Sequence, residues 1–404
     1  MASHRLEFAP ERDSELFSAA PASAAVFVLR GPDDGGEPYV SKTSNLRRRL
    51  QRLLSAPEGQ GRKLNLRDRV RWVEWTPTGS DFEASLLLYQ TLRREFPHTY
   101  GKRLRLRFAP LVKLILDNPY SRAVVTTRIS GLKPRSEYFG PFPTRVAAEK
   151  FANDSLDLFK MRRCTFDLNP DPAFPGCLYS EMKMCLAPCF KGCSDAEYAA
   201  EVGRVQQYLE SGGQSLVREI ERARDEASAG LDFEGAAALH TRLEKVNAAV
   251  SQLPEIVRRL EELNGVMVQP SAERESVALF KVVGGRICEP VDLNVGKQAE
   301  ASHLSSRPQS MEARITEALA TTTEPKLRSA LEWMEHLALL KRWYYRSVKT
   351  GELFLTGSDG QLPMRRVVRG VSRVFRGEKA AGDLSETAGD YWRFRAGEAG
   401  IRES

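Results

Sequence analysis

The sequence predicts an α+β protein of several domains: an amino-terminal α/β domain, a cysteine-rich segment, an α-helical hairpin, and a small β-meander with helices. Three observations predict this class. Short apolar runs alternate with helical spacings over residues 20–102. Five of the six cysteines then fall between residues 164 and 193. Farther on, two apolar stripes at helical spacing flank a short turn near residue 230. A chain of 404 residues has room for two to four domains.

The first expected domain, residues 20–102, has the element order β-β-α-β-α. A buried strand at 25–29 is followed by a turn rich in glycine and aspartate, and then by a return strand at 39–41. A helix capped by Thr43 or Ser44 comes next, then a strand at 69–75 and a helix at 80–95. The polar residues before position 20 are expected to be loose.

The first helix of this domain is amphipathic and strongly basic. Leucines 46, 50, 53 and 54 mark its buried side, whereas arginines 47, 48 and 52 lie on the other side, with Arg49 near the boundary. Arginines gathered in this way attract phosphates. The sequence therefore predicts a DNA-binding surface made of Arg47, Arg48, Arg49 and Arg52, and a solvated helix face is the alternative.

The second region, residues 103–200, is expected to hold short strands up to residue 142, a helix at 143–161, and the cysteine-rich segment. Cys164, Cys177, Cys185 and Cys189 follow the spacing Cys-x12-Cys-x7-Cys-x3-Cys. Gathered thiolates hold soft metals or iron–sulfur clusters. The spacing differs from the tight pairs of zinc ribbons. Cys193 is an extra thiol that competes as a ligand, and Cys288 is expected to be a small core residue.

Residues 201–253 are predicted to contain an antiparallel helical hairpin. One stripe comprises Leu216, Ile220, Ala223 and Ala227, and the other comprises Ala236, Leu239, Leu243, Val246 and Val250. Gly230 is expected to end the first helix in the left-handed conformation. Two helices alone cannot bury this seam, so it packs within the chain or docks another helical hairpin.

Residues 254–380 form the last expected region. A three-stranded meander is predicted at 265–269, 276–283 and 286–295, followed by helices over 309–347. Tryptophans and tyrosines near the end of those helices are expected to be core, with base stacking as the alternative. Arginines recur from residue 362, and residues 381–404 are expected to be a disordered tail.

The charge balance favours a polyanionic partner. Lysine and arginine number 60 against 53 acidic residues, for a net charge of +7 and a pI near 9.1. The sequence has no apolar run of about 20 residues, so we expect no membrane span. The acidic amino end is unlike a signal peptide. We therefore expect a cytoplasmic protein, in which clustered cysteines are ligands rather than disulfides.

Four blocks carry a resemblance to one family. Tyr39-Val40-Ser41-Lys42, followed by Asn45 to Leu50, resembles the GIY-YIG endonuclease domain. The other blocks are residues 138–143, the segment from Cys185 to Cys189, and the hairpin turn at 231–237. In this order, over residues 24–295, they resemble the UvrC family of nucleotide excision repair. The sequence after residue 295 shows neither that family's second nuclease motif nor its helix-hairpin-helix, so it resembles a truncated or divergent member.

The resemblance implies a set of roles. Tyr39, Lys42 and Arg49 would be catalytic, with Mg²⁺ or Mn²⁺ required only by an active nuclease. Cys164, Cys177, Cys185 and Cys189 would hold a [4Fe–4S] cluster, with zinc as the alternative. The turn residues Phe233, Glu234 and Ala237 would bind a UvrB-like protein, and DNA would be the substrate.

The sequence departs from the family at several motif positions of the GIY-YIG nuclease domain. The glutamate that binds the catalytic metal falls at Tyr89, and a phenol is a poor Mg²⁺ ligand beside a carboxylate. The motif's first tyrosine is Phe27, its second glycine is Ser41, and the domain's asparagine is Gly101. We therefore predict a DNA-binding repair protein whose GIY-YIG domain is impaired. The alternatives are an active endonuclease making a single incision and an iron–sulfur interaction or redox module.

Overall fold

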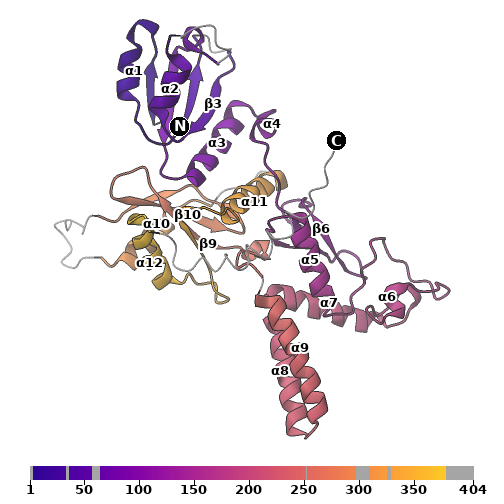
Figure 1. Ribbon diagram of the computed structural model, residues 1–404. Helices are drawn as coiled ribbons and strands as arrows, with labels where there is room; N and C mark the ends of the chain where they lie inside the picture. The colour runs from indigo at the N-terminus through magenta and orange to yellow at the C-terminus, as the bar shows by residue number, and fades with distance from the viewer. Residues whose placement is uncertain are drawn as a thin grey trace.

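The computed structural model describes residues 3–32, 36–56, 64–251, 253–296, 309–324 and 329–378. Its elements form an α+β protein with sheets in three regions and a helical hairpin that projects from the rest of the molecule (Figure 1). The α+β class is therefore confirmed. The expected tail at 381–404 lies outside the described residues. None of the described helices is long and apolar enough to cross a membrane.

The amino-terminal sheet is antiparallel and has four strands in the order β1-β4-β2-β3. These are β1 (His4–Glu7), β2 (Ala25–Arg30), β3 (Tyr39–Thr43) and β4 (Trp72–Pro77). The expectation that the first 20 residues are loose is wrong. β1 pairs along β4, and α1 (Asp13–Ala19) buries Leu16 in the domain core. Both elements are short and polar, so they lack the periodicity that identifies an element from sequence alone.

The two faces of this sheet are covered by different helices. Side chains alternate along a strand, so Phe27 and Leu29 share one face with Tyr39, which pairs with Leu29. That face packs against α1 and α2 (Leu46–Leu54), whose four leucines are buried there. Val26 and Val28 point to the opposite face, where they line a small hollow with residues of α3 (Asp81–Glu95).

Helix α3 belongs to two hydrophobic cores at once. Leu87 and Thr91 face the amino-terminal sheet. Phe82, Leu86 and Tyr89 lie on the other side of the helix and join the core that continues into the carboxy-terminal region. Figure 1 shows α3 between the amino-terminal sheet and α11 (Ala330–Tyr344). The short α4 (Tyr100–Leu104) follows and leads to the middle region.

The middle region is built on a second antiparallel sheet. Its order is β6-β5-β7-β8, formed by β5 (Leu111–Ile115), β6 (Arg122–Thr126), β7 (Glu137–Gly140) and β8 (Arg258–Arg259). Helix α5 (Arg145–Leu156) packs against β5 and β6. Helix α7 (Asp195–Glu210) begins at a capping box, in which Ser194 accepts from the Glu197 backbone and Glu197 accepts from the Ser194 backbone. The cysteine-rich segment joins α5 to α7 and contains only the short α6 (Leu178–Glu181) and one 3-10 turn.

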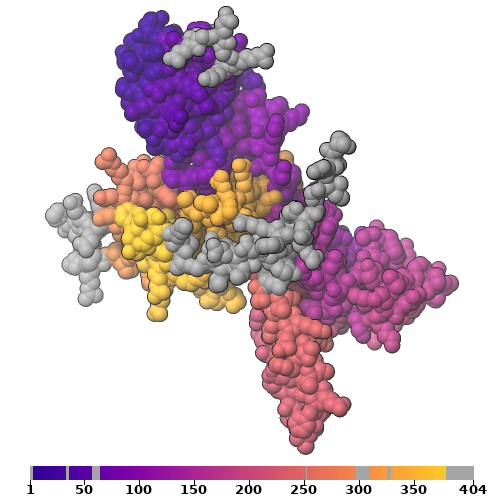
Figure 2. All heavy atoms as spheres, viewed as in Figure 1, coloured from indigo at the N-terminus to yellow at the C-terminus, as the bar shows by residue number. Residues whose placement is uncertain are grey.

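The expected helical hairpin is present as α8 (Gln214–Ala229) and α9 (Phe233–Ser251). Its base is buried by Leu216, Val217, Ile220, Leu243 and Val246, whereas its far end extends into solvent (Figure 2). The turn differs from expectation. Gly230 has a φ of −80°, and it is Leu231 that takes the left-handed conformation, with a φ of 62°. The helix therefore ends at Ala229, two residues before the left-handed Leu231.

The carboxy-terminal region contains the expected meander. Strands β9 (Gly265–Pro270) and β10 (Ser276–Val283) pair along their length, and the third strand is split into β11 (Arg286–Ile287) and β12 (Val291–Asn294). β13 (Glu352–Leu355) adds to the far side of β9. Helices α10 (Met311–Ala320), α11 and α12 (Met364–Phe375) pack on this sheet. Trp333 and Trp343 are buried, so their assignment to the core is confirmed.

Candidate functional site

The structure brings two of the three predicted catalytic residues together. Tyr39 lies on β3, and Arg49 lies on α2, which begins where the Asn45 side chain accepts a hydrogen bond from the Arg48 backbone N–H. Arg49 Nη2 donates to Tyr39 Oη at 2.8 Å. The pair occupies the sheet face that α1 and α2 cover. A phenol held by a guanidinium can orient a water or contact a phosphate.

Lys42 does not join this pair. It lies three residues along β3 from Tyr39, so its side chain leaves the opposite face of the sheet. Its Nζ lies 2.6 Å from Asp81 Oδ1 and 2.8 Å from Ser85 Oγ on α3. Burial raises the pKa of Asp81, but Lys42 and Arg346 together hold it below its usual value. Lys42 is therefore committed to an ion pair across the sheet from the proposed catalytic pair.

Tyr89, which occupies the position of the family's metal-binding glutamate, faces the carboxy-terminal region. Its side chain is 2% exposed, and its Oη donates to Glu335 Oε2 on α11 at 2.8 Å. Arg93 donates to the same phenol oxygen at 3.0 Å and also pairs with Glu332. Burial and the Glu335 carboxylate raise the pKa of Tyr89 far above that of a free phenol. Tyr89 thus works as a neutral hydrogen-bond donor in an interface between regions.

Further contacts strengthen the same interface. Arg346 pairs with Asp81 at the start of α3, and Gln90 donates to Glu289 at 2.7 Å. Glu83, by contrast, makes a local contact at the start of α3: it accepts from the Gly79 N–H at 2.7 Å, and burial raises its pKa to about 7. The partners on α11 were missed at the sequence level. No local pattern in the sequence connects Tyr89 with Glu335, which lies 246 residues farther along the chain.

The four arginines of the predicted DNA-binding surface divide into two pairs. Arg47 is held at the domain surface, because its Nε donates to Ala20 O at 2.9 Å. Arg49 is held by Tyr39. Arg48 and Arg52 are exposed one turn apart on α2, and among the described residues their side chains have no hydrogen bond or ion pair. These two remain available to an external phosphate.

The four predicted metal ligands converge on one cavity. Cys164, Cys177, Cys185 and Cys189 all line one small cavity of about 20 Å³, together with Arg162 and Tyr179. Cys193 is absent from this lining, and Cys288 is 1% exposed within the carboxy-terminal core. The four predicted thiols thus line one cavity, and the fifth does not; their role as metal ligands stays a prediction.

In the described part of the chain, no three cysteine, histidine, aspartate or glutamate side chains lie close enough to share one metal ion. A single zinc ion needs four sulfurs at about 2.3 Å from one point, whereas a cluster binds each thiolate to a different iron. Burial, followed by the neighbouring thiols, raises the pKa of Cys185 to about 11. The Cys185 thiol therefore stays protonated unless a cation compensates its charge.

The tip of the hairpin exposes apolar side chains. Leu231 is 73% exposed and Phe233 is 66% exposed. Asp232 accepts from the Gly235 N–H at 2.9 Å and so holds the first turn of α9. Phe233 and Ala237 are four residues apart and share a helix face, beside the exposed Glu234. The predicted partner-binding residues thus form one surface at the free end of the hairpin.

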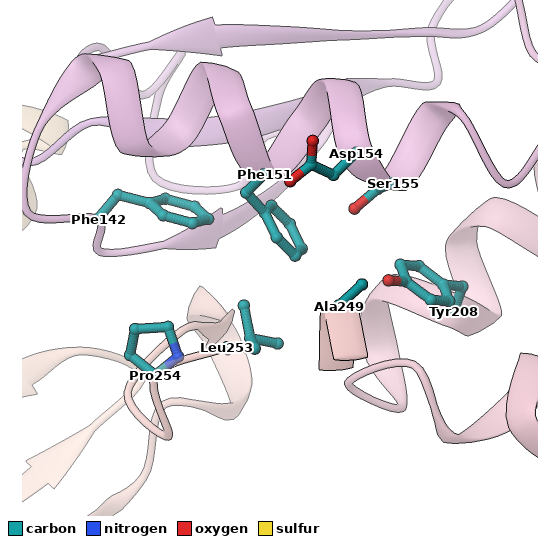
Figure 3. Close-up of a pocket in the computed structure, with 8 residues that line it drawn as sticks. All are labelled: Phe142, Phe151, Asp154, Ser155, Tyr208, Ala249, Leu253 and Pro254. Atoms are coloured by element: carbon teal, nitrogen blue, oxygen red, sulfur yellow. The ribbon is translucent and has the colours of Figure 1, made fainter. Parts of the chain in front are cut away.

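A small pocket lies at the other end of the hairpin, between α5, α7 and the end of α9 (Figure 3). Phe142, Phe151, Leu253 and Pro254 are half of its eight lining residues, and Asp154 and Ser155 are among its polar ones. At the hairpin base, a Cβ on Gly213 would lie 2.2 Å from Val250 Cγ2, so only glycine fits there. The pocket carries no arrangement of catalytic groups, and it marks imperfect packing where the hairpin meets the middle region.

Comparison with known proteins gives the same family as the motifs. Residues 111–208, which include all four cavity cysteines, match the UvrC/Cho excinuclease middle domain. This chain is a divergent UvrC-like protein. The chain is 29% identical over 216 residues to the UvrABC system protein C of Lactiplantibacillus plantarum, which covers 53% of this chain and 34% of the relative.

Two further relatives extend this comparison. The UvrABC system protein C of Carboxydothermus hydrogenoformans is 31% identical over 234 residues, covering 56% of this chain and 37% of the relative. That of Ectopseudomonas mendocina is 29% identical over 255 residues, covering 62% and 40%. The chain thus spans between about a third and two fifths of the length of these curated relatives. No solved structure matches the chain. The predicted resemblance to UvrC is therefore confirmed.

Proposed function

We propose that this protein binds DNA in nucleotide excision repair, and that its GIY-YIG-like domain does not cut DNA by the family mechanism. The observation that carries the repair assignment is the match of residues 111–208 to the UvrC/Cho middle domain. The net charge of +7 and the free arginines of α2 support DNA as the ligand.

The direction of Tyr89 supports the loss of cleavage. An active site of this kind needs a carboxylate to hold a divalent metal near the Tyr39–Arg49 pair. In this chain the corresponding side chain is a buried phenol bonded to Glu335. Lys42 is turned to the opposite face of the sheet, where Asp81 holds it. The remaining Tyr39–Arg49 pair can bind a phosphate without the metal.

We further propose that Cys164, Cys177, Cys185 and Cys189 hold a [4Fe–4S] cluster. Four soft donors around a shared cavity, rather than around one point, support the cluster over zinc. When bound, the cluster would supply cross-links among segments that carry little secondary structure of their own. The chain supplies the four thiols and the polar and cationic groups that surround them.

The hairpin tip is proposed as the contact for a UvrB-like protein. Phe233 has about two thirds of its side chain in solvent, and an exposed aromatic residue is a typical anchor for a partner's pocket. A pull-down with UvrB tests this role. We expect Phe233→Ala to abolish retention and Val348→Ala, a change at a residue 81% exposed elsewhere, to leave it unchanged. Equal retention of both variants would contradict this proposal.

A nicking assay on damaged duplex tests the nuclease proposal. We expect wild-type protein to retard the duplex but to leave it intact with Mg²⁺ or Mn²⁺. Arg49→Ala probes the Tyr39–Arg49 pair, and Arg145→Ala is the control, because Arg145 is an exposed arginine on α5 that pairs with Glu149 and lies outside the predicted DNA-binding surface. Metal-dependent incision that is lost in Arg49→Ala but kept in Arg145→Ala would establish the active single-incision endonuclease instead. Absence of any DNA binding would favour the iron–sulfur interaction or redox module.

A further inference from the structure

Arg162 is a fully buried cation beside the cysteine cavity. The residue is 1% exposed and lines the cavity together with the four cysteines. Its Nε donates to Tyr120 O at 2.8 Å, and its Nη1 donates to Phe166 O at 2.8 Å. The same Nη1 lies 3.2 Å from Cys164 Sγ. These contacts fix the guanidinium plane against the first of the four thiols.

The charge of Arg162 has no carboxylate to balance it within the described residues. Its partners are two backbone carbonyls and one sulfur, and its buried Nη2 has no hydrogen-bond partner. The adjacent Arg163, by contrast, pairs with Asp157 at 2.6 Å. Burying an unpaired guanidinium is strongly unfavourable, so buried arginines are normally matched by an anion. The groups around this cation that can become anionic are the cavity thiols.

We propose that Arg162 is the internal counter-cation of the metal–thiolate centre. This inference rests on the cluster proposed above. Four thiolates around an iron–sulfur core leave the centre with a net negative charge, which the guanidinium offsets at the Cys164 side. The Nη1 bond to the sulfur also draws electron density from that ligand.

Two consequences follow for the loaded protein. A positive charge and a hydrogen bond to a ligand sulfur both stabilise the reduced cluster, so Arg162 raises its reduction potential. They also hold the Cys164 thiolate in place, which slows the loss of metal to competing chelators. Arg162 acts here as a positioning residue, through Cys164 and through the field in the cavity.

The chain offers a matched set of variants. Arg162→Met removes the charge and keeps an unbranched apolar stem, whereas Arg162→Lys keeps the charge but loses the planar fork. Arg163→Met is the control, because Arg163 is the neighbouring cavity-lining cation but is already balanced by Asp157 and lies 5.5 Å over the Tyr179 ring.

The experiment compares full-length chains purified anaerobically. Iron, zinc and sulfide are counted per chain, the rate of metal release to a chelator is followed, and the reduction potential is measured. Losing a hydrogen-bond partner of a metal ligand typically weakens metal affinity by about 10–100-fold. We therefore expect Arg162→Met to release metal at least about tenfold faster than wild type and to have a lower reduction potential. Arg162→Lys should keep a potential near that of wild type but release metal faster. Arg163→Met should match wild type in both measurements.

The possible outcomes distinguish the role of Arg162 from the existence of the metal centre itself. Wild-type chains that hold neither iron and sulfide nor zinc would remove the metal centre itself. Wild-type chains that hold the centre, with Arg162→Met equal to them in release rate and potential, would overturn the role of Arg162 alone. If Arg162→Met does not fold, Arg162→Lys decides: release faster than from Arg163→Met supports the role, and equal release overturns it.

Discussion

Replacing Tyr89 with glutamate tests whether this position belongs to a nuclease site or to an interface. Tyr89→Glu restores the family's residue, so a simple motif argument predicts restored metal binding. The structure predicts the opposite, because the Tyr89 phenol donates to Glu335 and lies close to Glu332 through Arg93. The introduced carboxylate would meet two carboxylates inside a buried contact. We expect a less stable protein with no gain of cleavage.

The size of the effect follows from the geometry. The phenol oxygen is 2.8 Å from Glu335, so an introduced carboxylate would lie in its immediate neighbourhood. At about 4 Å, two like charges repel by about 4 kcal/mol at an effective dielectric constant of about 20. Arg93 offsets part of this, and the lost aromatic packing adds to it. We expect Tyr89→Glu to lower the free energy of unfolding by about 3–5 kcal/mol, the range found when a buried pair is broken.

Two further variants serve as references for the change in the free energy of unfolding. Tyr89→Phe keeps the ring but removes one hydrogen bond to a charged acceptor, which we expect to lower the free energy of unfolding by about 1.5–3 kcal/mol. Tyr120→Phe is the surface control, since Tyr120 also donates to a carboxylate, Asp195, at 2.8 Å but in an exposed setting. Its change should stay within about 0.5 kcal/mol. Tyr89→Glu combined with Glu335→Gln should recover part of the lost stability.

Denaturant unfolding of the full chain gives the stabilities, and a nicking assay with Mg²⁺ and Mn²⁺ gives the activity. The reasoning is refuted if Tyr89→Glu is as stable as wild type and gains metal-dependent incision that Arg49→Ala removes. That result would place position 89 on the nuclease groove rather than against α11.

Three further predictions concern other groups. Burial raises the pKa of Glu83 to about 7 in the folded state, whereas the unfolded chain loses this proton near pH 4.5. The folded state therefore binds more protons between these two pH values. As a result, Glu83 lowers the free energy of unfolding progressively as the pH rises from about 4.5 to about 7. Glu83→Gln should therefore raise the free energy of unfolding by about 2 kcal/mol at pH 8 and not at pH 4, whereas the exposed Glu273→Gln should change neither. Arg48→Gln with Arg52→Gln should reduce the slope of log affinity for duplex DNA against log salt by about 2, and an unchanged slope would exclude these arginines from the contact. Cys185→Ser should lose the anaerobic visible spectrum together with iron and sulfide, whereas Cys193→Ser, outside the cavity lining, should keep both.

Local patterns predicted much of this molecule. The leucine spacing of α2, the meander of β9 and β10, and the two stripes of the hairpin are each encoded within one or two neighbouring elements. The gathering of four cysteines was also predictable from their spacing in the sequence, whereas their role as metal ligands stays a prediction. The four chosen cysteines line one cavity, and Cys193 does not.

Long-range packing was beyond the reach of these patterns. β1 and α1 are short and mostly exposed, and only their pairing with β4 and the burial of Leu16 stabilise them. Tyr89 was recognised as a departure from the family, but its partner Glu335 lies on another region of the chain. The identity of such partners depends on how α3 docks onto α11, which no spacing within either helix specifies.

The sharing of α3 between two cores has a practical consequence. A fragment ending at residue 104 would keep the whole amino-terminal sheet and its helices but lose α11 and the carboxy-terminal residues that pack against Phe82 and Tyr89. Those side chains would form an exposed hydrophobic patch on an otherwise folded fragment. Exposed patches of this kind promote self-association. We therefore expect the amino-terminal domain to be poorly behaved when it is expressed alone. Fusing it to another protein would require a segment that covers the same side chains as α11 does.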